Sequence, residues 1–165
     1  MKLIRVGKAG VERPGVLVSE THYFPLDSIP DFNEDFFGSG GVEKISSIID
    51  QRHTDGVAPT PLEGLRLGAP IARPHQIICI GLNYADHAAE TGAEIPPEPI
   101  IFTKSPNTLI GPNDSIRIPR NSVKTDWEVE LGVVIGARAQ YLADEADGLA
   151  HIAGYMVCND VSERE

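Results

Sequence analysis

Two glutamates stand two residues apart in a segment with the alternating pattern of a β-strand. They are Glu128 and Glu130 of TDWEVELGVVIG, residues 125–136. Successive side chains of a strand point to opposite faces, so the two carboxylates should share a face, with their Cα atoms roughly 7 Å apart. Negative charges this close repel, and removing them from water is costly unless a positive group lies nearby. The pair therefore indicates either a divalent-cation site or, as the simpler alternative, a solvated outer face.

The opposite face of the same strand is apolar throughout, which predicts that the strand is buried on that side. The residues concerned are Trp127, Val129, Leu131, Val133 and Ile135. On the glutamate face, Gly132 and Val134 add no further charge. Their presence argues mildly against a fully solvated glutamate face.

An acidic residue at the end of a second apolar run is a candidate third ligand. Asp160 follows GYMVCN, and a hard cation prefers oxygen ligands. As an alternative or additional role, Asp160 and Glu163 match a capping box that opens a helix. One helical turn would then bring Arg164 beside Asp160. Arg164 could clamp a substrate carboxylate or pair with an acidic neighbour.

A histidine and a glutamate three residues apart form a candidate general base. His87 and Glu90 lie in NYADHAAETG, which predicts a short helix with Asn83 as its N-cap and Gly92 as its stop. Residues at this spacing share a helix face. A carboxylate bonded to one imidazole nitrogen makes the other nitrogen a better base. The alternative is an incidental pair on a surface helix.

One lysine completes the set of candidate site residues. Lys104 follows the apolar run IIF in IFTKSPN, and it becomes a functional candidate only in combination with the residues above. Phosphoryl transfer is disfavoured because the chain has neither Gly-x-x-x-x-Gly-Lys-Ser/Thr nor Gly-x-Gly-x-x-Gly.

The elements that must position these residues divide near residue 72. The first part, residues 1–71, predicts a small α+β unit that ends in a connector rich in Pro, Gly and Ala. Its helix is expected at residues 41–53, and its strands at residues 3–6, 15–19 and 21–26. The second part, residues 72–165, predicts short strands interrupted by prolines, with a further helix at residues 144–152. The strand ending at Gly81 has the composition of a buried strand.

Composition excludes several classes of partner. The chain has 165 residues and a formal net charge of −10, so nucleic acid and anionic membranes are not expected to bind. No apolar run reaches the length of a membrane-spanning helix. Cys79 and Cys158 lie in apolar runs and predict buried, reduced thiols. A cytoplasmic location is the simplest expectation.

Four motifs in a fixed order carry a specific resemblance. GLNYADHAAETG, EPIIFTKSPNTLIGPND, KTDWEVELGVVIG and GYMVCNDVSERE follow one another along the chain. Together, over about residues 72–165, they closely resemble the fumarylacetoacetate hydrolase family. The first 70 residues resemble the small, variable N-terminal domain of many members. The resemblance implies a mainly β fold with short helices, a mixed β-sandwich or barrel that is incomplete in this chain. It also implies a homodimer when complete.

The resemblance implies a role for each candidate residue. The carboxylates that match the family's ligands for Mg²⁺ or Mn²⁺ are Glu128, Glu130 and Asp160. His87 and Glu90 match the catalytic dyad, and Lys104 and Arg164 match basic positions near the substrate. Typical members are hydrolases that cleave a carbon–carbon bond in an acylpyruvate or related 2,4-diketo acid. Others decarboxylate oxaloacetate, or isomerise or hydrate related keto acids.

Two departures from the family pattern bear on function. Many members have Ala and Asp where this chain has Glu163 and Glu165. The variant resembles a branch described as ureidoglycolate lyase or as a hydrolase of 2,4-diketo-3-deoxy sugar acids. The chain also stops at Glu165, whereas family members continue with residues that complete the pocket. The expectation is a fragment, catalytic or not, or a protein whose missing part is supplied elsewhere.

Overall fold

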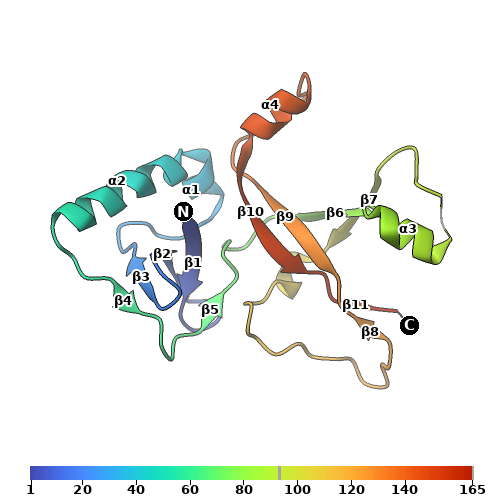
Figure 1. Cartoon of the computed structure of the whole chain (residues 1–165), viewed down its shortest axis with the longest axis horizontal. Coiled ribbons are helices and arrows are strands. Elements are labelled where there is room, and N and C mark those ends of the chain that lie inside the picture. Colours follow the sequence, from blue (N-terminus) through green and yellow to red (C-terminus); the bar gives the residue numbers. More distant parts are fainter. Residues whose placement is uncertain (93, 165) are drawn as a thin grey trace.

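The computed structural model describes residues 1–92 and 94–164, without the side chains at positions 87 and 91. It consists of an N-terminal lobe, the described residues up to 70, and a second lobe of paired strands beside it (Figure 1). The prediction of a mainly β chain with short helices is confirmed. The elements of the N-terminal lobe are β1 (Lys2–Val6), β2 (Arg13–Leu17), β3 (His22–Pro25), α1 (Glu34–Gly38), α2 (Gly41–Thr54), β4 (Thr60–Pro61) and β5 (Leu67–Gly68).

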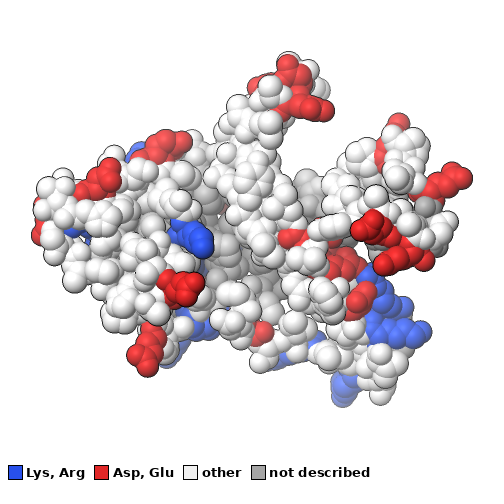
Figure 2. All heavy atoms as spheres, in the orientation of Figure 1, with Lys and Arg blue, Asp and Glu red and all other residues white. Residues whose placement is uncertain are grey.

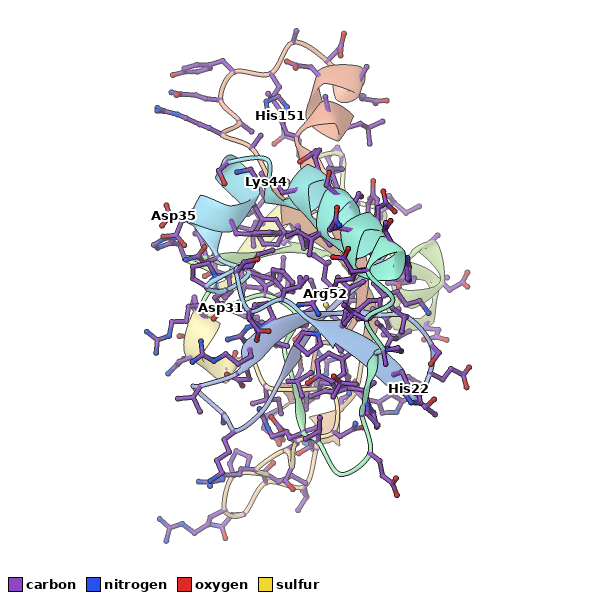
Figure 3. All side chains as sticks on the ribbon, turned by 90° about the vertical axis from the view of Figure 1, so that its left-hand side faces the viewer. His22, Asp31, Asp35, Lys44, Arg52 and His151 are labelled. Carbon is purple, nitrogen blue, oxygen red and sulfur yellow. The ribbon has the colours of Figure 1, made fainter. Side chains whose placement is uncertain are left out.

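The N-terminal lobe is an antiparallel sheet covered on one face by α2. Its strand order is β4-β3-β2-β1-β5. Figure 3 shows α2 lying over these strands, with Arg52 between the helix and the sheet. The guanidinium of Arg52 stands 5.7 Å from the centre of the Phe24 ring. The core under the helix consists of Val16, Leu26, Phe32, Phe36 and Ile45.

The apolar periodicity of residues 41–53 accounts for α2. Ile45 is fully buried, and Val42, Ile48 and Ile49 pack against the same core, as their spacing on one helix face predicts. The observed helix extends one residue beyond the predicted range. The three predicted strands of this lobe are also present.

The second lobe consists of two-stranded antiparallel ladders and two short helices. The ladders are β6–β7, β9–β10 and β8–β11, and the part of the chain that the structure describes does not close them into a barrel. The predicted strand at 125–136 is divided, because Trp127 and Glu128 interrupt it. The elements are β6 (Ile77–Gly81), α3 (Ala85–Thr91), β7 (Ile100–Lys104), a 3₁₀ turn (Pro106–Thr108), β8 (Thr125–Asp126), β9 (Val129–Ile135), α4 (Glu145–Ala150), β10 (Ile152–Asn159) and β11 (Ser162–Glu163).

The apolar face of β9 is exposed, so the prediction that it is buried is wrong. Trp127 is 72% exposed, and Leu131 is 64% exposed. Ile78 and Ile80 of β6 are likewise exposed, although a buried strand was predicted there. The alternation itself is as predicted, but within residues 1–92 and 94–164 no layer packs on these faces. A period-2 pattern shows which side chains share a face, whereas burial needs a partner layer.

Two smaller features of this lobe also differ from or extend the predictions. The N-cap of α3 is Tyr84 rather than Asn83, and it makes no side-chain capping bond. Gly92 ends α3 in the left-handed conformation, as predicted.

No helix among the described residues is long and apolar enough to span a membrane.

An ion network joins the two lobes. Arg66 donates to Asp114 through Nε at 2.7 Å and Nη2 at 2.5 Å, and to Glu12 through Nη1 at 2.8 Å. Glu12 also accepts from Arg5, which is buried. The hydrogen bonds from Arg66 hold the pKa of Asp114 below its ordinary value. The network fixes the 111–114 loop of the second lobe to the edge of the N-terminal sheet.

Candidate active site

The register of β9 and β10 brings the predicted metal ligands to one end of a ladder. Glu130 pairs with Cys158 across the ladder. Beyond its last pair, the backbone N–H of Asp160 donates to the carbonyl of Glu128 at 2.8 Å. The N–H of Glu128 donates to Asn159 Oδ1 at 3.1 Å. Asp160 therefore lies beside Glu128, although 32 positions separate them in the sequence.

The two glutamates occupy the more covered face of their strand. Glu128 and Glu130 are half-buried, whereas their neighbours Trp127, Val129 and Leu131 are exposed. On the same face, Cys158 Sγ lies over Gly132, because a Cβ built at Gly132 would stand 2.6 Å from that sulfur. The predicted sharing of a face by the glutamates agrees with this alternation.

Lys104, at the end of β7, neutralises Asp160. Its ammonium group forms an ion pair with the Asp160 carboxylate. It also donates to Ser162 Oγ at 3.2 Å. The Asp160 side chain is only 16% exposed, so this contact supplies positive charge to a largely desolvated carboxylate.

Arg164 reaches the site in an extended conformation and not on a helix. Residues Ser162–Glu163 form β11, so the predicted capping box at Asp160 is wrong. Strand pairing with β8 satisfies the backbone there. Arg164 donates to Asp126 Oδ2 at 2.9 Å and also pairs with Glu128. The hydrogen bond to Asp126 makes the largest contribution to raising the pKa of Arg164, and the one to Glu128 raises it further.

Both cysteines lie near the carboxylates. Burial raises the pKa of the Cys79 thiol, and the charge of Asp160 raises it further. Burial also raises the pKa of Cys158, with smaller contributions from Glu130 and Asp160. Both thiols are free, but they are half-buried and not fully buried as predicted. Glu130 and Asp160 therefore both lie close enough to the two thiols to raise their pKa values.

The helix that carries the predicted dyad, α3, is hydrogen-bonded at its start to the backbone of β9. Tyr84 Oη donates to the carbonyl of Val129 at 2.8 Å, which brings the start of α3 next to β9. Glu90 is exposed on α3. The side chain of His87 lies outside the described residues, so its pairing with Glu90 stays a prediction.

Sequence reasoning missed four residues that organise the site: Tyr84, Asp126, Asn159 and Ser162. Each contacts a residue far away in the chain, and no local pattern marks such contacts. For Asp126 a weak signal exists, because an acidic residue two positions before Glu128 adds a third negative charge to the same segment.

Basic side chains gather at one edge of this end of the second lobe. Figure 2 shows acidic side chains spread over the visible face, whereas basic ones gather most densely over β8, β11 and the loop that leads into β8. That loop contains Arg117, Arg120 and Lys124, all exposed. In a chain of net charge −10, such a patch locally favours an anionic ligand.

The donor chemistry of the site fits a hard divalent cation. The segment just before β9, β9 itself and the residue after β10 each contribute one carboxylate, and oxygen donors of this kind suit Mg²⁺ and Mn²⁺. In this structure Lys104 forms an ion pair with Asp160, and Arg164 forms one with Glu128. In residues 1–92 and 94–164, no group of three His, Cys, Asp or Glu side chains stands close enough to hold a metal ion.

A family model decides the relationship of this chain to known proteins. The model for the fumarylacetoacetate (FAA) hydrolase C-terminal domain matches residues 76–165, which is more than half of the chain. The chain belongs to the fumarylacetoacetate hydrolase family. The resemblance carried by the four sequence motifs is therefore confirmed.

Relatives of this fumarylacetoacetate hydrolase family chain are longer than it is. A protein of Burkholderia orbicola (strain MC0-3) with the name "Putative hydrolase" is 48% identical over 166 residues, covering 100% of this chain and 57% of that protein. The chain thus spans about 57% of the length of the curated relatives it matches.

Solved structures of fumarylacetoacetate hydrolase family proteins share the fold. A "probable 2-hydroxyhepta-2,4-diene-1,7-dioate isomerase" from Mycobacterium abscessus has 34% identity and a TM-score of 0.72, over 99% of this chain and 53% of that one. Maleylpyruvate hydrolase from Sphingobium sp. SYK-6, in complex with manganese(II) and pyruvate, has 22% identity and a TM-score of 0.74, over 97% and 59%. Members of this family are enzymes, among them hydrolases and isomerases.

Proposed function

We propose that this chain carries part of the active site of a Mg²⁺- or Mn²⁺-dependent hydrolase. The reaction would cleave a carbon–carbon bond in an acylpyruvate or 2,4-diketo acid, for example a 2,4-diketo-3-deoxy sugar acid. The products would be pyruvate, or a related keto acid, and a second acid. The observation that carries this proposal is the strand register, which brings the backbone positions of Glu128, Glu130 and Asp160 to one end of the β9–β10 ladder.

The proposed metal ligands are Glu128, Glu130 and Asp160. A divalent cation bound there would polarise carbonyl oxygens and stabilise negative charge that develops on a departing enolate. The manganese and pyruvate reported for maleylpyruvate hydrolase support this choice of cofactor through the shared fold.

The remaining steps are proposed for the chain's own side chains. His87, oriented by Glu90, would take a proton from water, and the hydroxide would attack the distal carbonyl carbon of the substrate. Breaking the carbon–carbon bond would leave the electron pair on the keto-acid fragment as an enolate, which a proton then quenches. Arg164 and Lys104 would bind the substrate carboxylate or oxyanion.

A second candidate is isomerisation of a related keto acid, favoured by the 34% identity to the Mycobacterium abscessus protein. The same metal and dyad would then move a proton from one carbon to another, breaking one C–H bond and forming another without cleaving a carbon–carbon bond. Ureidoglycolate lyase-like and oxaloacetate decarboxylase activities are separate alternatives within the family. The remaining alternative is that the chain is a fragment without catalytic activity. We also propose that the protein is a cytoplasmic homodimer.

Calorimetry with Mg²⁺ and Mn²⁺ tests the ligand assignment. Glu130→Gln should weaken binding at least tenfold, since one charged ligand is lost, whereas Glu145→Gln on α4 should not. Unchanged affinity of Glu130→Gln would contradict the assignment. His87→Ala should then abolish turnover of an acylpyruvate and keep metal affinity. Comparing this chain with a longer one, of the length of its relatives, separates the fragment alternative from the enzyme.

A further inference from the structure

A two-residue strand holds Arg164 in the candidate site. In β11, Ser162 pairs with Asp126 and Glu163 pairs with Thr125 of β8. The N–H of Arg164 donates to the carbonyl of Lys124 at 3.1 Å. A ladder this short contributes few backbone hydrogen bonds, so side chains must help to fix its register.

The carboxylate of Glu163 supplies that help. Its Oε2 accepts a hydrogen bond from Thr125 Oγ1 at 2.8 Å and another from Ser122 Oγ. Its Oε1 is buried and has no hydrogen-bond partner among the described residues. One oxygen therefore makes both contacts, and they join β11 to the segment that runs into β8.

The residue next to Glu163 is the one that needs this support. The Arg164 side chain is 43% exposed, and a long, exposed side chain loses considerable rotamer entropy when it is held in one place. Its partners Asp126 and Glu128 belong to the segment that Glu163 holds through Ser122 and Thr125. Fixing β11 on β8 thus fixes the distance between Arg164 and these two carboxylates.

We propose that Glu163 is a positioning residue that orients Arg164 toward a carboxylate-bearing substrate. The inference rests on the proposed function of Arg164 as a substrate clamp. Through Ser122 and Thr125, Glu163 holds the strand whose next residue is Arg164.

Steady-state kinetics on the full chain with a keto-acid substrate tests the proposal through a double-mutant cycle. Glu163→Ala should raise KM about tenfold with kcat nearly unchanged, the effect of losing a hydrogen bond to a charged group. Glu163→Gln, which keeps an acceptor oxygen, should stay close to the parent. Glu145→Ala on α4 is the matched control. In an Arg164→Ala background, Glu163→Ala should have little further effect, whereas additive losses would overturn the proposal.

A spectroscopic measurement separates this proposal from the proposed function. The Arg164 Nε–H resonance should shift and exchange faster with solvent in Glu163→Ala, and it should recover in Glu163→Gln. An unchanged resonance would overturn the positioning role whatever the activity. If the resonance changes but Arg164→Ala leaves KM unaffected, Glu163 still positions Arg164, and it is the substrate-clamp function that fails.

Discussion

The ammonium group of Lys104 forms an ion pair with the carboxylate of Asp160, joining the end of β7 to the residue that follows β10. Both belong to the candidate site, and their pairing means that a cation entering there competes with the lysine for Asp160. We therefore expect Lys104 to affect metal affinity in addition to its proposed contact with substrate.

Removing this competition should strengthen metal binding. Lys104→Met is expected to lower the Kd for Mg²⁺ about three- to fivefold, the equivalent of up to ~1 kcal/mol for a partly exposed charge pair. Isothermal titration calorimetry measures this Kd. Lys44→Met on α2 removes the same charge outside the candidate site and is the matched control. Weaker binding by Lys104→Met would mean that the lysine holds Asp160 in place instead of competing with a cation.

Close packing of Cys158 over Gly132 should make that position intolerant of a side chain. A Cβ at Gly132 would stand 2.6 Å from Cys158 Sγ and 2.8 Å from Met156 Cγ, so Gly132→Ala should cost about 1–3 kcal/mol of unfolding free energy. Urea denaturation gives the value. Gly154→Ala is the control, because no atom lies within 4 Å of its Cβ position. Adding Cys158→Ala should recover part of the loss.

The Arg66–Asp114 contact should make the free energy of unfolding depend on pH in the acidic range. The pKa of Asp114 is lower in the folded chain than its ordinary value of 3.8, so its charged form stabilises the fold. This contribution is present above pH 3.8 and is lost as the pH falls further toward the lowered folded pKa. Asp114→Asn should therefore have a lower Tm at neutral pH and a flatter stability profile below pH 4. Glu20→Gln, in an exposed turn, should leave both unchanged. A parallel shift of the whole profile would contradict the prediction.

Substitutions on the exposed face of β9 should have little effect on the free energy of unfolding of this chain. Leu131→Ser should change the unfolding free energy by less than about 0.5 kcal/mol, because Leu131 is 64% exposed. It should also reduce binding of the dye ANS. Ile45→Ala, in the buried core, should cost about 2–5 kcal/mol. A large loss from Leu131→Ser would show that this face is covered in solution, for example by a second copy of the chain.

Local patterns predicted much of this protein. The spacing of Val42, Ile45, Ile48 and Ile49 was sufficient to predict α2, and alternation around Glu128 and Glu130 was sufficient to predict their shared face. Such predictions succeed because helix and strand periodicity is set by backbone geometry within a few residues. The family, too, was recognisable from the order of four short motifs.

By itself, then, the sequence determined the types of element, the candidate residues and the family. The tertiary structure alone decided which residues meet: Asp160 beside Glu128, Lys104 on Asp160, Arg164 between Asp126 and Glu128, and Tyr84 on the backbone of β9. It also decided which face of β9 is covered, and there the sequence-based expectation was wrong. The physical reason is common to all of these. Register and layer packing depend on contacts between segments tens of residues apart, and local periodicity contains no information about them.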